Sequence, residues 1–162
     1  MPLFMRVSDV EGPYSVGNLG DELFSIDSYS QALHLPSSEG GAHARTIGTP
    51  NVGEFRVTKK VDSSTALLMQ ALCTAATYDQ ITVYDVVTES SGEMAAASTI
   101  TLNNAVIRDL SYHGANEAEA TQELAITFDR INWAISSVDR LTGNIEPPKE
   151  YLWEAKAGGV RS

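Results

Sequence analysis

Cysteine is nearly absent from this chain, and a single residue, Cys73, excludes an internal disulfide. Cys73 lies among leucines and alanines, so we expect it to be a small buried side chain rather than a reactive thiol. Long apolar runs are also absent, so we expect no membrane-spanning segment. The N-terminal stretch MPLFMRVSDVEG lacks an apolar run behind a basic start, so we expect no signal peptide and synthesis in the cytoplasm.

Basic residues are scarce as well. Eleven lysines and arginines stand against 21 aspartates and glutamates, which leaves a formal net charge of −10. Such a surface repels phosphate backbones and argues against a nucleic-acid partner. The acids serve either solubility or attraction to a basic partner surface. With 162 residues, 43% of them hydrophobic, the chain can bury a core, and we expect one domain over residues 1–162.

Patterns that carry catalysis or bind cofactors are missing too. The chain has no G-x-S-x-G motif, and its glycine-rich segments match no phosphate-binding fingerprint. Its histidines, at positions 34, 43 and 113, are too scattered for a metal site. Asp27 and Asp85 would form an acid–base pair only if the fold joined them. We therefore expect no catalytic residue, no metal and no cofactor, and an assembly subunit rather than an enzyme.

What the chain does contain is strand-like alternation of apolar and polar residues. It occurs over residues 3–10, 23–35, 55–61, 81–87, 98–113 and 122–135. Many strands of this kind predict a sandwich or a barrel. The apolar parity changes at Asp129–Arg130, which predicts a bulge or a strand passing from one packed surface to another. The tail beyond residue 135 is either a loose linker or docks through Leu152 and Trp153.

The segment FRVTKKVDSSTALLMQAL (55–72) departs from this alternation halfway along. After Asp62 the apolar residues, including Leu68 and Leu72, follow helical spacing. We predict one short helix over about residues 63–76, capped by Asp62 or Ser63, on a flank or open end of the β structure. Residues 36–53 show no periodicity and predict a long extended loop, functional or mobile.

The same segment resembles the signature of the haemolysin-coregulated protein (Hcp) family, the tube proteins of type VI secretion systems. The matching residues are Phe55, Val57, Thr58, Lys59, Lys60, Val61 and Asp62. A second stretch, ELAITFDRINWAI, is similar to a late strand of that family at Phe128, Ile131 and Trp133. The opening LFMRVSDVEG and the ending YLWEAKAGG match more loosely.

This resemblance implies a β-barrel of antiparallel strands with a helix on its flank. It implies a homo-hexameric ring, and rings stacking into a hollow tube that carries small effectors in its lumen. The implied partners are the sheath, spike and baseplate proteins of the machine, with no membrane insertion. The implied route runs from the bacterial cytoplasm to the extracellular space or a target cell without a signal peptide. The loop over residues 36–53 would reach the next ring through His43, Arg45 and Ile47.

Three alternatives stay open from the sequence. A tail-tube protein of a phage or another contractile injection particle shares the fold class. A monomeric binding module would grip a ligand with the long loop, and a small hydrolase would carry an active site that no motif marks. The mass of the purified protein separates a ring from a monomeric module.

Overall fold

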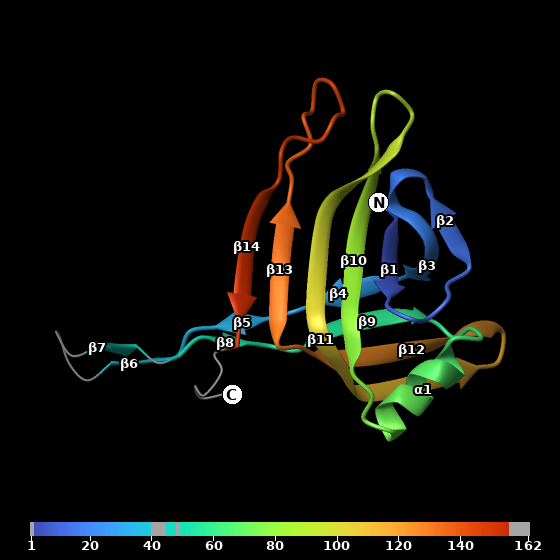
Figure 1. Ribbon diagram of the computed structural model, residues 1–162, viewed down its shortest axis with the longest axis vertical. Coiled ribbons are helices and arrows are strands. Elements are labelled where there is room, and N and C mark those ends of the chain that lie inside the picture. Colours follow the sequence, from blue (N-terminus) through green and yellow to red (C-terminus); the bar gives the residue numbers. More distant parts are fainter. Residues whose placement is uncertain (1, 40–44, 48, 156–162) are drawn as a thin grey trace.

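The structure is a computed structural model that describes residues 2–39, 45–47 and 49–155, with the backbone only for residues 37–39 and 45–47 (Figure 1). The described part contains one α-helix, α1 (Thr65–Cys73), and a short 3-10 helix, η1 (Gly17–Leu19). The strands are β1 (Leu3–Val7), β2 (Tyr14–Val16), β3 (Gly20–Ile26), β4 (Ser28–Ser30), β5 (Leu33–His34), β6 (Ser37–Glu39), β7 (Arg45–Ile47), β8 (Asn51–Val52), β9 (Phe55–Lys60), β10 (Tyr78–Thr88), β11 (Met94–Ala115), β12 (Ala118–Thr127), β13 (Arg130–Ile135) and β14 (Lys149–Glu154).

The strands form two sets that cross each other. One set contains β2, β3, β1, β10, β13 and β14, and the other contains β12, β9 and β4. The 22-residue strand β11 belongs to both, because residues 94–105 pair with β10 and residues 106–115 pair with β12. Figure 1 shows the two sets running in different directions on either side of this bend.

The hydrophobic core lies between the two crossing sets. Alternate residues of strands such as β9 point inward, as expected for strands with one buried face. The largest fully buried apolar side chains are Phe24, Phe55, Met5, Leu23, Leu68, Ile81, Leu102, Leu124, Ile126 and Ile131. Each stabilises the fold by about 1.5–3 kcal/mol relative to an exposed position.

The mainly β class with antiparallel strands is confirmed, but the sheet does not close into a barrel. β2 and β4 lie at the two ends of the hydrogen-bonded order. The covalent chain joins the two sets instead, because β3 ends at Ile26 and β4 begins at Ser28. At this bend the Asp27 N–H donates to the Thr58 carbonyl at 2.7 Å. The chain therefore pairs with β1 along β3 and with β9 along β4. The alternation of residues 23–35 could not reveal this change of partner.

The predicted helix is present, shorter than expected, as α1. The N-cap is Ser64, which makes no side-chain capping bond, so the expected cap at Asp62 or Ser63 is wrong. Asp62 lies two residues earlier, and its Oδ1 accepts the Ser64 N–H at 2.9 Å. The Thr65 hydroxyl oxygen accepts the Asp62 N–H at 3.1 Å in return. This reciprocal pair satisfies backbone donors at the helix start.

The buried stripe of α1 confirms the helical spacing but corrects the expectation for Cys73. Leu68 is only 1% exposed, Ala71 is buried with it, and Leu72 is partly buried against the core. Cys73 is exposed. It lies two residues beyond Ala71, about 200° around the helix axis, and so faces away from the core.

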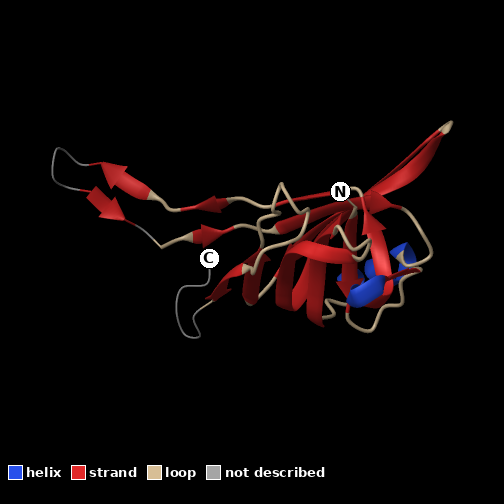
Figure 2. Ribbon diagram, turned by 90° about the horizontal axis from the view of Figure 1, so that it is seen from above, coloured by secondary structure: helices blue, strands red, loops and turns tan. Residues whose placement is uncertain are grey.

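The segment expected as a structureless loop is a two-stranded arm. β5 pairs with β8, and β6 pairs with β7, both antiparallel. We call residues 33–52 the arm. Figure 2 shows the described parts of the arm projecting away from the crossed sheets. β5 and β8 have two residues each and β6 and β7 have three, so these strands are too short for the sequence to show alternation.

The parity change at Asp129–Arg130 marks a passage between the two sets, the second of the expected alternatives. β12 ends at Thr127 and pairs with β9, whereas β13 begins at Arg130 and pairs with the first part of β11. The tail docks as β14, which pairs with β13 from Lys149 to Glu154.

Candidate functional site

The arm is fixed to the body by a small hydrogen-bonded junction. The Gly53 N–H donates to the Ala32 carbonyl at 2.9 Å, and the Gln31 side-chain amide donates to the Gly53 carbonyl at 3.1 Å. The Trp133 indole N–H donates to Gln31 Oε1 at 3.3 Å. A Cβ on Gly53 would lie 2.6 Å from the Ala32 carbonyl oxygen, so this close approach requires glycine.

Aromatic side chains extend this junction along the edge of the sheet. The rings of Trp133 and Tyr151 stack, with centroids 5.9 Å apart and an interplanar angle of 6°. Phe128 and Trp153 meet edge to face at 6.3 Å. Such pairs contribute about 0.5–1.5 kcal/mol beyond the area they bury. Tyr151 nevertheless remains 62% exposed, so its outer face is open to a partner.

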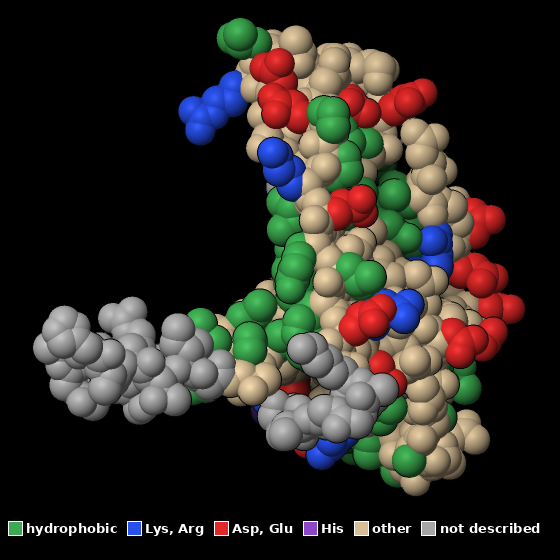
Figure 3. Space-filling view, turned by 60° about the vertical axis from the view of Figure 1, so that its left-hand side comes forward, with side chains coloured by type: hydrophobic (Ala, Val, Ile, Leu, Met, Phe, Trp, Pro, Cys, Tyr) green, Lys and Arg blue, Asp and Glu red, His purple; other side chains and the backbone are tan. Residues whose placement is uncertain are grey.

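A groove of about 1020 Å³ lies between the base of the arm and the C-terminal half of β14. Its floor comes from the region where β11 and β12 bend, including Val106 and Phe128. Its walls come from residues 49–54 and 151–155. Figure 3 shows hydrophobic side chains gathered along the hollowed side of the molecule above the arm. We call this feature the arm-base groove.

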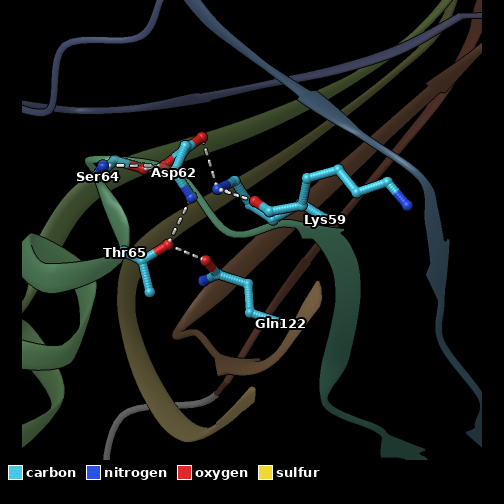
Figure 4. Close-up of polar contacts among 6 residues, drawn as sticks. Lys59, Asp62, Ser64, Thr65 and Gln122 are labelled. Atoms are coloured by element: carbon cyan, nitrogen blue, oxygen red, sulfur yellow. Dashed lines mark hydrogen bonds and ion pairs between the residues drawn. The ribbon is translucent and has the colours of Figure 1, made fainter. Parts of the chain in front are cut away.

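The motif that carries the family resemblance, residues 55–62, contributes mainly to the interior of the fold. Lys59 is fully buried, and its ammonium donates to Asp62 Oδ2 at 2.9 Å and to the Lys60 carbonyl at 3.0 Å (Figure 4). It also lies 5.6 Å from the centre of the Phe24 ring. Lys60 points outward and pairs with Asp27 at 3.4 Å. The alternation of the strand therefore gives the two lysines different environments.

Asp62 joins this lysine to the helix start. Burial raises its pKa, but hydrogen bonds from Ser64 and Lys59 outweigh it and hold the pKa of Asp62 below its ordinary value. Thr65 also donates its hydroxyl to Gln122 Oε1 of β12, within the cluster drawn in Figure 4. The strand, the helix and β12 are thus tied together by one polar network.

The structure locates the sequence-predicted residues as follows. Phe55, Val57, Lys59 and Ile131 are fully buried, and Trp133 supports the arm. The remaining motif residues, Thr58, Lys60, Val61, Asp62 and Phe128, are partly buried or exposed.

Of the three arm candidates, His43 lies outside the described residues. Arg45 and Ile47 lie in β7, where the structure describes only their backbone. Sequence reasoning missed Gln31, Gly53, Tyr151 and Gln122. The one available signal was Gly53, a glycine in the short link between β8 and β9.

No catalytic or metal-binding arrangement is found in the part of the chain that the structure describes. Asp27 pairs with Lys60, and no hydrogen bond joins it to Asp85. Burial raises the pKa of Asp85 above its ordinary value. Over residues 2–39, 45–47 and 49–155, no group of histidine, cysteine, aspartate and glutamate side chains is placed to hold a metal. The described helices also include none with the length and apolarity needed to cross a membrane.

Solved structures share this fold. A structure described as a type six secretion system protein aligns over 94% of both chains, with a TM-score of 0.83 and 13% identity. Hcp1 from E. coli EAEC 042 aligns over 94% of this chain and 96% of its own, with a TM-score of 0.72 and 15% identity. Hcp3 from Pseudomonas aeruginosa aligns over 96% and 99%, with a TM-score of 0.65 and 15% identity.

A search of the curated proteins finds no match. The solved structures, at these identities, show the fold alone. The family model described as "Type VI secretion system effector, Hcp" matches residues 4–135, which is most of the chain and includes both motifs identified in the sequence. The chain therefore belongs to the Hcp family of type VI secretion tube proteins.

Proposed function

We propose that this chain, as one domain over residues 1–162, is the subunit of a type VI secretion inner tube. Six copies close into a ring, and the rings stack into a hollow tube. Small effectors travel in the lumen, and sheath contraction drives the tube out of the bacterial cytoplasm. The sheath, spike and baseplate proteins are its partners. It performs no catalysis, and its role is structural.

One observation carries this proposal: among the residues that the structure describes, none covers the projecting part of the arm. The arm is held at its base by Gln31, Gly53 and Trp133, yet it projects from the body (Figure 2). Leu33 and Leu35 on it are 58% and 52% exposed. An exposed apolar projection fits a partner surface better than solvent. A copy of the chain in the next ring supplies that surface, with Arg45 pairing to an acid there and His43 and Ile47 beside it.

The experiment replaces residues 38–49 by a short Gly-Ser linker and counts rings and stacks by negative-stain electron microscopy. The base of the arm is retained, so the body keeps its fold. Rings that persist while stacks disappear support a stacking role for the arm. Stacks that form at the same protein concentration and salt as in the parent protein would show that another element joins the rings.

A second variant tests whether the exposed apolar side chains of the arm matter separately from the length of the arm. Leu33→Ser with Leu35→Ser leaves the arm at full length but removes its exposed apolar side chains. If those side chains contact the next ring, this variant also loses stacks. If only the shortened arm loses stacks, the contact depends on the distal residues, including His43, Arg45 and Ile47.

A further inference from the structure

A rigid loop at the end of the molecule far from the arm presents one almost fully exposed leucine. The tip loop, residues 136–148, connects β13 and β14 (Figure 1). Its Leu141 is 96% exposed, the largest value among the exposed large apolar residues of the described chain. Isolated exposed leucines are common on protein surfaces, so exposure alone does not single it out. What singles out Leu141 is the hydrogen-bonded structure of the loop that carries it.

The tip loop is closed by its own hydrogen bonds. The Asp139 N–H donates to the Asn144 carbonyl at 2.8 Å, and the Gly143 N–H donates to the Asp139 carbonyl at 2.7 Å. The Leu141 N–H donates to Asp139 Oδ1 at 2.8 Å. Ser90 on the neighbouring β10–β11 turn donates its hydroxyl to Asn144 Oδ1 at 2.8 Å. A loop held in this way loses little entropy when it binds, which favours contact over disorder.

The arm-base groove lies toward the opposite end of the same molecule. Its lining combines apolar and aromatic side chains, namely Val52, Val106, Phe128, Tyr151, Leu152 and Trp153. At about 1020 Å³ it has room for a leucine together with the turn that carries it. The groove and the tip loop are therefore a recess and a projection on one chain, separated along its long axis (Figure 1).

Charge favours the same match. Arg140 precedes Leu141 and forms no ion pair with any described residue. The groove lining contains three acids, Glu54, Asp129 and Glu154, against one base, Arg108. The two glutamates already pair on the exposed surface with arginines outside the lining, and Asp129 also has a partner within the chain, so an incoming cation adds a further partner to acids that are already engaged. The leucine supplies most of the contact, and the arginine gives it orientation.

We propose that the tip loop of one subunit inserts Leu141 into the arm-base groove of the next subunit in the same ring. This inference rests on the proposed hexamer and names the two surfaces that meet in it. A contact between two different surfaces repeats head to tail, and it closes into a ring when its rotation closes. The arm leaves the body across the line from tip loop to groove (Figure 1), so it remains free to reach a copy outside the ring.

The test is disulfide capture in a Cys73→Ser background, which removes the only native thiol. Two chains are made, one carrying Leu141→Cys with Asn51→Cys and one carrying Leu141→Cys with Leu152→Cys. Asn51 and Leu152 both line the groove. A disulfide forms only where Cβ atoms approach to about 3.5–4.5 Å, so two groove positions allow for the register of the contact. The matched control moves the first thiol to Leu67, which is 51% exposed on α1.

After mild oxidation with diamide, the proposal predicts a non-reducing gel ladder that ends at six chains for at least one groove position. It predicts no ladder for the Leu67→Cys control. Intact rings without a ladder would overturn the inference while the hexamer stands. A third chain carries Leu141→Cys alone, and dimers from it would show a head-to-head contact. A ladder beyond six from either double variant would place the contact between rings. A protein that is monomeric before oxidation would overturn the proposed function itself.

A second variant tests the contact without oxidation. Leu141→Asp does not touch the core, so the fold should persist, as checked by circular dichroism. It is expected to raise the concentration at which rings dissociate by about tenfold or more, as for a central interface residue. Leu67→Asp should leave that concentration unchanged. Equal behaviour of the two variants would overturn the role of Leu141.

Discussion

At the scale of single residues, the neighbouring lysines Lys59 and Lys60 of one motif have opposite environments in the fold. Lys59 is inside and fully buried, while Lys60 is outside and pairs with Asp27 on the surface. A buried ammonium is costly unless a carboxylate and further acceptors receive its protons. Asp62 is that carboxylate, and its other oxygen accepts the N–H of Ser64, the residue directly before α1. The motif thus ties a core charge to the start of the helix.

Asp62→Asn should therefore destabilise the monomer fold by about 1–3 kcal/mol, because it weakens a hydrogen bond to a buried charge. The urea midpoint measures this loss. Asp27→Asn is the matched control, since its pair with Lys60 is exposed and contributes about 0–1 kcal/mol. Equal losses for the two variants would contradict the buried role of Lys59.

The same variant has a defined pH dependence. The pKa of Asp62 is lowered in the folded protein from an ordinary value of 3.8. Its stabilisation is then present above pH 3.8 and is lost as the pH falls through the lower folded value. The difference in stability between parent and Asp62→Asn should shrink below pH 3.8 and stay constant above about pH 5. A difference that instead grows in acid would mean that the carboxylate is not favoured by folding.

At the scale of elements, α1 is held mainly by a narrow buried stripe. Leu68→Ala should cost about 2–5 kcal/mol, because Leu68 is fully packed against the core. Leu67→Ala removes the same atoms one position away, where the residue is 51% exposed, and should change stability by about 0.5 kcal/mol or less. Chemical denaturation of both variants provides the comparison. Similar costs at the two positions would show that α1 packs in a different rotation.

The base of the arm gives a second prediction at this scale. Trp133→Phe keeps an aromatic ring beside Tyr151 but removes the N–H that binds Gln31. We expect faster amide hydrogen exchange at Gly53, with a loss of about 0.5–1.5 kcal/mol in local stability and little change in β10. Trp153→Phe is the control, because Trp153 contacts Phe128 through its ring. Unchanged exchange in Trp133→Phe would mean that the arm is held by its backbone bonds alone.

Elements differ in how well the sequence predicts them. The strands around Phe55, Leu124 and Ile131 were predictable because one face of each is buried, which imposes alternation. The arm was not, because its strands of two or three residues are too short to leave a period in the sequence. Cys73 was misplaced because its apolar neighbours on the chain lie on another side of the helix. The junction of Gln31 with Trp133 joins residues 102 positions apart, a contact that no local pattern encodes.

At the scale of the whole molecule, the described sheet is open and has exposed strand edges. Over the described residues, β14 has a strand partner on one side only, β2 and β4 lie at the two ends of the strand order, and the arm projects beyond the body. Exposed strand edges invite association, and a closed ring is one way in which proteins satisfy them. An open sheet within the subunit and a closed assembly of subunits are therefore compatible.

The central claim is that this subunit functions as a closed hexameric ring. Light scattering of the purified protein at micromolar concentration, coupled to size-exclusion chromatography, measures its mass directly. The account predicts one species with six times the mass of the 17.4 kDa chain, stable on dilution within the micromolar range. A species with the mass of a single chain under these conditions would contradict it.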